Sequence, residues 1–207
     1  MVKQASFSAS RQERKKEETR MKIVNAAMAL FKQRGFAATS MEQIAQEADV
    51  ARRTLYNHFP VKEAIIDEYI KRSFKENNTE RILRLQKLPD TRARMIQVFL
   101  ELIEGVQASK DFFEPYLVYR MQNMVSFEVD ESEKSGFHLV AVELIRLGQK
   151  TGEIRNDLPP YVLEDMFEFV FVEIVKQFYL KLEEFNAREA IERCVDPFLN
   201  GVKSESK

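Results

Sequence analysis

Residues 39–59 read TSMEQIAQEADVARRTLYNHF, and this stretch decides how the chain folds at its N-terminal end. A Ser or Thr followed three residues later by an acid or an amide is a capping box, which marks the start of a helix. Thr39 with Glu42 fits this pattern, and so does Ser40 with Gln43. The spacing predicts a short helix from about Met41, a turn at residues 49–51 and a second short helix over residues 52–58.

The second of these helices has a polar outer face. Leu55 and Phe59 are four residues apart and are predicted to point inward, which leaves Arg, Thr, Tyr, Asn and His side chains facing out. Such a face suits the DNA major groove, where Arg meets acceptors and Asn meets a paired donor and acceptor. The predicted DNA-binding residues, for bases or for phosphates, are Thr39, Ser40, Met41, Arg52, Arg53, Thr54, Tyr56, Asn57, His58 and Lys62.

This segment resembles the helix-turn-helix of the tetracycline-repressor (TetR) family of bacterial transcription regulators over about residues 21–66. The residues in register with the family pattern are Thr39, Ile44, Ala45, Ala48, Val50, Tyr56, His58, Phe59, Lys62 and Glu63. The resemblance implies an all-α homodimer that binds an operator and releases it when a small molecule binds. Two residues depart from the pattern, Asp49 for the usual turn Gly and Ala51 for the usual capping Ser. Asp tolerates a positive φ less well than Gly, and a lost cap costs about 1 kcal/mol unless Asp49 replaces it.

Charge is unevenly distributed along the chain. The first 75 residues carry 15 Lys and Arg against 9 Asp and Glu, whereas the remainder carries 17 against 24. A basic N-terminal third is typical of a DNA-binding domain, although a solvated charged face gives the same count. The basic residues of a tail over residues 1–16 fit either a minor-groove arm or a solubilising segment, and the second interpretation is preferred.

Composition excludes several classes of protein. Cys194 is the single cysteine among 207 residues, so no intrachain disulfide forms. The N-terminus has no apolar signal segment, and no apolar run is long enough to span a membrane, so we expect a cytoplasmic protein. The sequence has no Gly-rich phosphate loop, no nucleophile motif and no Cys/His metal spacing. We therefore expect no enzyme activity, no cofactor and no metal.

The rest of the chain has helical periodicity throughout. We predict an all-α fold of about nine helices: a tail without regular structure over residues 1–16, a helix-turn-helix domain over 17–60, a linking helix over 61–88 and a helical ligand-binding and dimerisation domain over 89–207. The first helix is expected over residues 17–33. Later helices are expected over residues 91–106, 111–125, 131–150, 159–183 and 187–202.

Two sets of apolar residues in the second domain bear on function. The helix over residues 159–183 is apolar on more than one face, which fits either a central helix buried in a monomer or a dimer seam shared with the last helix, and the dimer seam is preferred. Its residues are Met166, Val170, Ile174, Phe178, Ile191, Val195, Phe198 and Leu199. The second set is rich in aromatic residues and, with nearby polar groups, could enclose a hydrophobic or aromatic effector. It comprises Phe99, Ile103, Phe112, Phe113, Tyr116, Tyr119, Arg120, Asn123, His138, Phe167 and Phe171. The alternative is ordinary core in a ligand-independent DNA-binding or protein-interaction module of the same fold.

Overall fold

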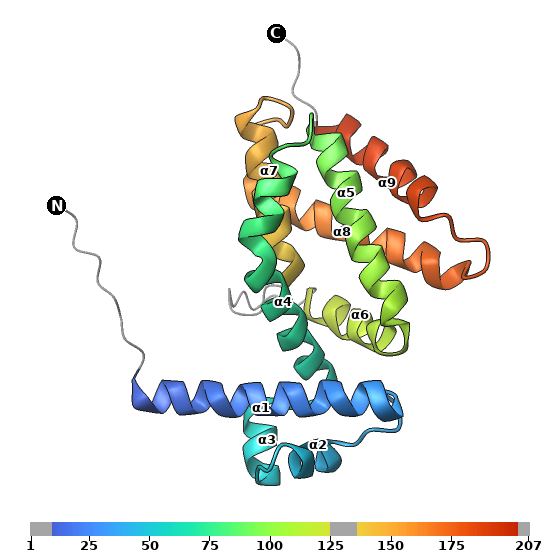
Figure 1. The fold of residues 1–207 in the computed structure, drawn as a ribbon. Coiled ribbons are helices and arrows are strands. Elements are labelled where there is room, and N and C mark those ends of the chain that lie inside the picture. Colours follow the sequence, from blue (N-terminus) through green and yellow to red (C-terminus); the bar gives the residue numbers. More distant parts are fainter. Residues whose placement is uncertain (1–9, 125–135, 203–207) are drawn as a thin grey trace, which may run out of the picture. The chain divides into compact units, whose positions relative to one another are not determined.

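The computed structural model describes residues 10–124 and 136–202, and this part of the chain forms nine α-helices and no strand (Figure 1). The prediction of an all-α fold is thereby confirmed. The chain divides into two compact units, Met1–Tyr69 and Ile70–Lys207, and the division falls inside the fourth helix. None of the described helices combines the length and the apolar character needed to cross a bilayer. The helices are α1 (Arg11–Arg34), α2 (Met41–Glu47), α3 (Arg52–His58), α4 (Lys62–Leu85), α5 (Thr91–Ala108), α6 (Lys110–Met124), α7 (Gly136–Lys150), α8 (Pro160–Leu180) and α9 (Ala187–Val202).

Helix α1 begins earlier than the sequence pattern predicted. Ser10 and Glu13 form a capping box in which the Ser10 Oγ accepts from the Glu13 amide at 3.2 Å and the Ser10 amide donates to the Glu13 carboxylate at 2.6 Å. The prediction of an unstructured tail is therefore wrong for residues 11–16, while residues 1–9 lie outside the described part of the chain. The reason is that this cap starts the helix more than three turns before Ile23, its first buried residue, so apolar periodicity does not reveal it.

The first unit is a three-helix domain around a small apolar core. Ile23, Ala27 and Phe31 of α1 are buried, as are Ile44 of α2 and Leu55 of α3. Helix α2 packs against both α1 and α3. The core therefore fixes α3 while leaving its opposite face in solvent.

The second unit is a helical bundle in which α8 packs against α7 and α9, and α5 packs against α9. Its core includes the fully buried side chains of Met95, Phe99, Leu144, Ile174 and Ile191. The observed helices start within one residue of the predicted boundaries except α7, for which residues 131–135 of the predicted span lie outside the described residues.

The C-terminal end of α4 is held by a buried arginine of the second unit. The guanidinium of Arg94 donates to the backbone carbonyls of Leu85, at 3.2 Å, and Leu88, at 3.0 Å. It also pairs with Glu153 at 3.2 Å. Because a guanidinium satisfies carbonyls that a helix end leaves without partners, Arg94 anchors α4 at this end.

Candidate nucleic-acid interface and effector region

The start of α2 settles which of the two capping boxes forms. The Ser40 Oγ accepts from the Gln43 amide at 3.2 Å, and the Ser40 amide donates to the Gln43 side chain at 2.8 Å. Thr39 is 1% exposed, and its hydroxyl donates to the Gly35 carbonyl at 2.8 Å. Thr39 therefore stabilises the approach to α2 through a buried side chain, and its predicted contact with DNA stays a prediction. Ser40 is exposed, whereas the Met41 side chain is buried, so Met41 can offer only its backbone amide to a phosphate.

The turn between α2 and α3 uses the two residues that depart from the family pattern. Asp49 adopts φ 51°, a left-handed conformation that Gly adopts without steric cost and that Asp tolerates. The amide of Val50 donates to the Ala45 carbonyl at 3.0 Å and closes the turn. Helix α3 starts after Ala51 with no side-chain cap, so Asp49 does not replace the lost hydroxyl.

The outer face of α3 has the composition that the spacing predicted. Arg52, Arg53, Tyr56 and Asn57 are exposed, while Leu55 is fully buried. Thr54 and His58 are half-buried, and Phe59 is buried just after the helix. Helix α3 thus presents two guanidiniums, a phenol and an amide together on one solvent-facing surface.

Three of these groups form a cluster that the sequence analysis missed. Glu42 of α2 pairs with the Arg52 guanidinium at 2.6 Å and accepts a long hydrogen bond from the Tyr56 hydroxyl at 3.4 Å. The same guanidinium lies 5.7 Å from the centre of the Tyr56 ring. Hydrogen bonding to its own backbone, together with the charge of Arg52, holds the pKa of Glu42 below its usual value. In this arrangement Arg52 is oriented by Glu42, whereas Arg53 extends from α3 without an ion pair among the described residues.

Lys62 has a different position from the one predicted. Its ammonium donates to the carbonyls of Phe36 and Thr39, both at 2.7 Å, and lies 4.3 Å from the centre of the Phe36 ring. Both carbonyls belong to the segment between α1 and α2. Lys62 therefore fixes the start of α4 to the loop that precedes α2, and its predicted phosphate contact stays a prediction.

His58 lies at the end of α3 beside a second cation. The guanidinium of Arg20 reaches the His58 carbonyl at 3.5 Å, pairs with Glu68 at 2.7 Å and lies over the Phe59 ring at 4.5 Å. Burial, assisted by the charges of Arg20 and Lys16, lowers the pKa of His58. The His58 Nδ1 is buried with no hydrogen-bond partner in the described part of the chain. His58 is therefore a half-buried residue at the end of the exposed face of α3.

In the second unit, the predicted effector residues form a packed aromatic core. The ring of Phe99 stacks on that of Phe167 with centroids 4.8 Å apart and lies 6.1 Å from that of Phe171. Phe137 joins them at 4.9 Å from Phe171. Ile103 is buried beside these rings. The rings of this cluster are thus in direct contact with one another, and their predicted contact with an effector stays a prediction.

The remaining members of the predicted set lie on the helices around this core. Tyr116, Arg120 and His138 are buried, and Phe112, Phe113 and Tyr119 are half-buried. The Asn123 side chain lies outside the described residues.

Two buried carboxylates beside His138 were not predicted. The His138 Nδ1 lies 3.0 Å from the Glu168 carboxylate, and its Nε2 lies 3.7 Å from that of Glu164. All three residues are less than 10% exposed. The available signal was their spacing, because Glu164 and Glu168 are four residues apart on the face of α8 that also carries Phe167 and Phe171.

The predicted dimer seam requires correction. Five of its eight residues are less than 10% exposed and belong to the core of their own unit: Ile174, Phe178, Ile191, Val195 and Phe198. Val170 and Leu199 are half-buried, and Met166 is exposed. Apolar periodicity identified the buried stripe of α8 and α9, and it could not tell that stripe from one that faces a partner. The exposed apolar residues of α8 are Tyr161, Met166, Phe169 and Leu180.

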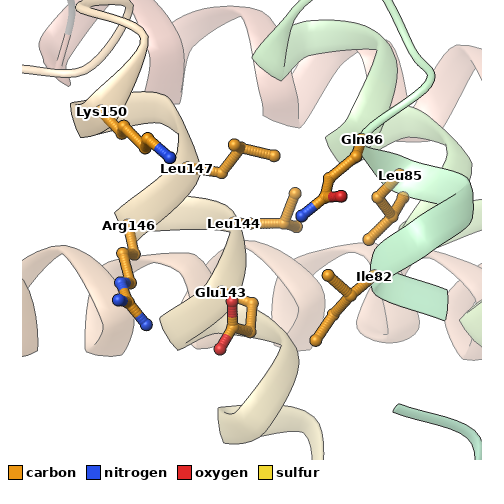
Figure 2. A pocket seen from close by; sticks show the side chains of 8 residues that line it. All are labelled: Ile82, Leu85, Gln86, Glu143, Leu144, Arg146, Leu147 and Lys150. Carbon is orange, nitrogen blue, oxygen red and sulfur yellow. The ribbon is translucent and has the colours of Figure 1, made fainter. Parts of the chain in front are cut away.

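Two surface grooves of the second unit lie away from the predicted effector residues. One is about 240 Å³ in volume and is bordered by the end of α4 and the second half of α7 (Figure 2). The other is about 350 Å³ and lies where α8 gives way to α9, with Phe185 and Arg193 in its lining.

A capped short helix, a tight turn and a second short helix with an exposed polar face define a helix-turn-helix protein. Residues 23–69 match the bacterial regulatory proteins of the tetR family. This part of the chain belongs to that family.

Similar proteins extend the comparison beyond the first unit. The chain is 28% identical over 138 residues to the HTH-type transcriptional regulator UidR of Escherichia coli K12, covering 67% of this chain and 56% of UidR. It thus spans little more than half the length of that relative. It is 26% identical over 162 residues to the transcriptional repressor DhaR of Mycobacterium sp. GP1, covering 70% of this chain and 75% of DhaR. The structure of Thermus thermophilus FadR, a TetR-family repressor in complex with lauroyl-CoA, superposes with a TM-score of 0.67 at 25% identity, over 91% of this chain and 97% of that one.

Proposed function

We propose that this protein is a homodimeric transcription regulator that binds an inverted-repeat DNA operator and acts as a repressor. The exposed face of α3 carries this proposal, since Arg52, Arg53 and Asn57 offer the donors that base edges accept. The start of α2 adds exposed Ser40 and the positive end of the helix dipole, which suit a phosphate. Action on the bacterial chromosome would place the protein in the cytoplasm.

Dimerisation is required by the geometry of operator recognition. One short helix reads only a few base pairs, so two copies about 34–36 Å apart are needed for a specific site. The exposed Met166, Phe169 and Leu180 of α8 are the residues that we propose for the seam. Large apolar side chains that a helix leaves exposed favour burial against a second copy.

Control by a hydrophobic effector is supported by the aromatic composition of the second unit and by the lauroyl-CoA bound to the related FadR. The close stacking of Phe99 and Phe167 instead favours the alternative, a ligand-independent DNA-binding module or a protein-interaction module. A ligand at those rings would first have to separate them.

Selection of bound fragments from random DNA tests the central proposal. We expect an inverted repeat to be enriched, and Arg53→Ala to weaken its binding by about 1–3 kcal/mol while relaxing one base position in each half-site. Leu83→Ala, an exposed substitution on α4, is the matched control and should bind as the native protein does. Recovery of unrelated sequences by both proteins would refute the assignment of α3 as the reading helix.

A further inference from the structure

An acidic side chain lies beside the basic and polar face of α3. Glu42 of α2 is exposed there and pairs with Arg52, which is exposed as well. A carboxylate that faces DNA is repelled by the phosphates, so it lowers the affinity for DNA of every sequence. This cost is offset only at a sequence where the carboxylate also makes a favourable contact, and such a contact would discriminate between base pairs.

Both members of the ion pair keep hydrogen-bonding capacity for a further partner. The Arg52 Nη2 lies 2.6 Å from the Glu42 Oε1, and the Tyr56 hydroxyl donates to the same oxygen at 3.4 Å. A guanidinium has five donors, and a carboxylate accepts about four hydrogen bonds. Unused donors of Arg52 therefore lie directly beside unused acceptor sites of Glu42.

Tyr56 supports the pair from a second side. The centre of its ring lies 5.7 Å from the Arg52 guanidinium, while its hydroxyl reaches the Glu42 carboxylate. The three side chains come from α2 and α3, which pack against each other in the core of the first unit. The donors and the acceptor are thus oriented before any DNA binds, so less conformational entropy is lost on binding.

A G·C base pair presents the complementary groups in the major groove. Guanine offers the acceptors N7 and O6, and the N4 amine of cytosine beside them is a donor. The Watson–Crick bond between O6 and N4 is an N–H···O bond of about 2.7–3.2 Å. The separation of the Arg52 Nη2 and the Glu42 Oε1, 2.6 Å, is close to that spacing. The guanidinium can therefore lie at guanine while the carboxylate lies at cytosine.

We propose that Glu42 and Arg52 together read one G·C base pair in each half-site, where Arg52 donates to guanine and Glu42 accepts from the N4 amine of cytosine. This inference rests on the proposed function, and it assigns base recognition to α2 as well as to α3. An A·T pair is the nearest competitor, because adenine offers the acceptor N7 beside the donor N6. Adenine meets only one donor of the guanidinium fork, and the thymine O4 then turns an acceptor toward the carboxylate, so G·C is favoured.

Selection from random DNA with the native protein, Arg52→Ala and Glu42→Ala identifies the base pair. Both variants should lose the preference for the same G·C pair and keep the other positions of the half-site. Glu47→Ala is the matched control, because Glu47 is exposed at the other end of α2 and has no ion pair in the described part of the chain. This control removes the same charge and should retain the native preference at every position.

Base analogues test the two contacts in the native protein and so do not depend on the folding of a variant. In the G·C pair, 7-deazaguanine removes the N7 acceptor, and 2-pyrimidinone in place of cytosine removes the N4 amine. Because each hydrogen bond has one charged partner, each analogue should weaken native operator binding about tenfold in fluorescence anisotropy. The 2-pyrimidinone duplex should bind Glu42→Ala as tightly as the unmodified duplex does, and 7-deazaguanine should likewise have no effect on Arg52→Ala.

Several results would contradict the shared recognition of one base pair. They are an A·T pair enriched at the position that both variants affect, different base pairs affected by Arg52→Ala and Glu42→Ala, and an equal loss from 2-pyrimidinone in the native protein and Glu42→Ala. If Glu42 only stabilises the first turn of α2, Glu42→Ala lowers Tm and keeps the native base preference, which would also overturn the proposal. A native protein that selects no DNA would refute the proposed function and this inference with it, whereas any of the preceding results leaves the proposed function intact.

Discussion

Replacement of Lys62 distinguishes between two possible roles of this residue, a structural role in the fold and a contact with DNA phosphate. Its ammonium donates to two backbone carbonyls at 2.7 Å and lies over the Phe36 ring. Lys62→Met keeps most of the aliphatic stem but removes the charge and every donor. The carbonyls of Phe36 and Thr39 then lose this partner in the loop that leads into α2.

The expected loss of stability follows from these contacts. Each hydrogen bond from a charged donor contributes about 1.5–3 kcal/mol, and the contact with the ring adds about 0.5–1 kcal/mol. Lys62 is only half-buried, and its burial lowers the pKa of the ammonium, so part of this gain is offset by lost hydration. A net loss of about 1–3 kcal/mol is expected for Lys62→Met, which corresponds to a fall in Tm of roughly 2–4 °C per kcal/mol.

Two measurements distinguish the roles. Urea unfolding followed by circular dichroism gives the loss of stability, and the salt dependence of operator binding gives the number of phosphate contacts. A structural lysine predicts an unchanged slope of log K against log salt, whereas each lost phosphate contact reduces the slope by about 0.9. Lys62→Arg is the matched control, because it retains the charge but places a planar fork where a compact ammonium meets two carbonyls.

The reasoning would be refuted by a Lys62→Met protein of native stability with a salt slope reduced by about one. A stable Lys62→Arg protein would also show that charge at this position matters more than the geometry of the two hydrogen bonds.

Three other predictions follow from the burial, pKa and ion-pair observations described above. Phe178 is 5% exposed, so Phe178→Asp should lower the free energy of unfolding by about 3 kcal/mol or more and unfold the chain. Phe169→Asp, at an exposed position, should leave a folded monomer. Circular dichroism reports folding and sedimentation reports the dimer, so the two outcomes can be distinguished. The pKa of His58 is lowered below 6.5 in the folded chain, so the unfolded chain binds the proton first and stability falls as pH drops from about 7 through the folded pKa. In His58→Gln the urea midpoint should therefore depend less on pH over this window. Equal dependence of the urea midpoint on pH in the native and variant proteins would contradict this prediction. Glu42→Gln removes a negative charge and releases Arg52, so it should raise the affinity for unrelated DNA and lower the ratio of operator affinity to that affinity. Fluorescence anisotropy with both DNAs measures this ratio. An unchanged ratio would show that Glu42 does not position Arg52 for binding.

The sequence predicted the elements whose determinants are local. The two candidate capping boxes before α2, the inward spacing of Leu55 and Phe59 and the polar residues between them each depend on positions a few residues apart, so their pattern is readable without tertiary information. The structure decided between the two boxes in favour of Ser40. The same holds for the boundaries of α5, α8 and α9. The start of α1 was missed because its cap precedes the apolar stripe.

Which face of a helix is buried, and against what, was decided by the tertiary structure. The apolar stripe of α8 predicted burial correctly, but the contacts of the chain with itself assign Phe178 to the core of its own unit. Periodicity shows which face of a helix is apolar, and it does not show whether the same chain or a partner buries that face.

The sequence by itself determined that residues 23–69 carry a helix-turn-helix of the TetR family with polar, Arg-rich residues on the outer face of its second helix. Only the tertiary structure decided that Lys62 binds carbonyls 23 and 26 residues earlier, and that Glu42 holds Arg52 in place. The physical reason is the range of the interactions. Caps, turns and helical spacing depend on neighbours within about four residues. The partners of a charged side chain can instead lie anywhere in the sequence, provided that the folded chain brings them within hydrogen-bonding distance.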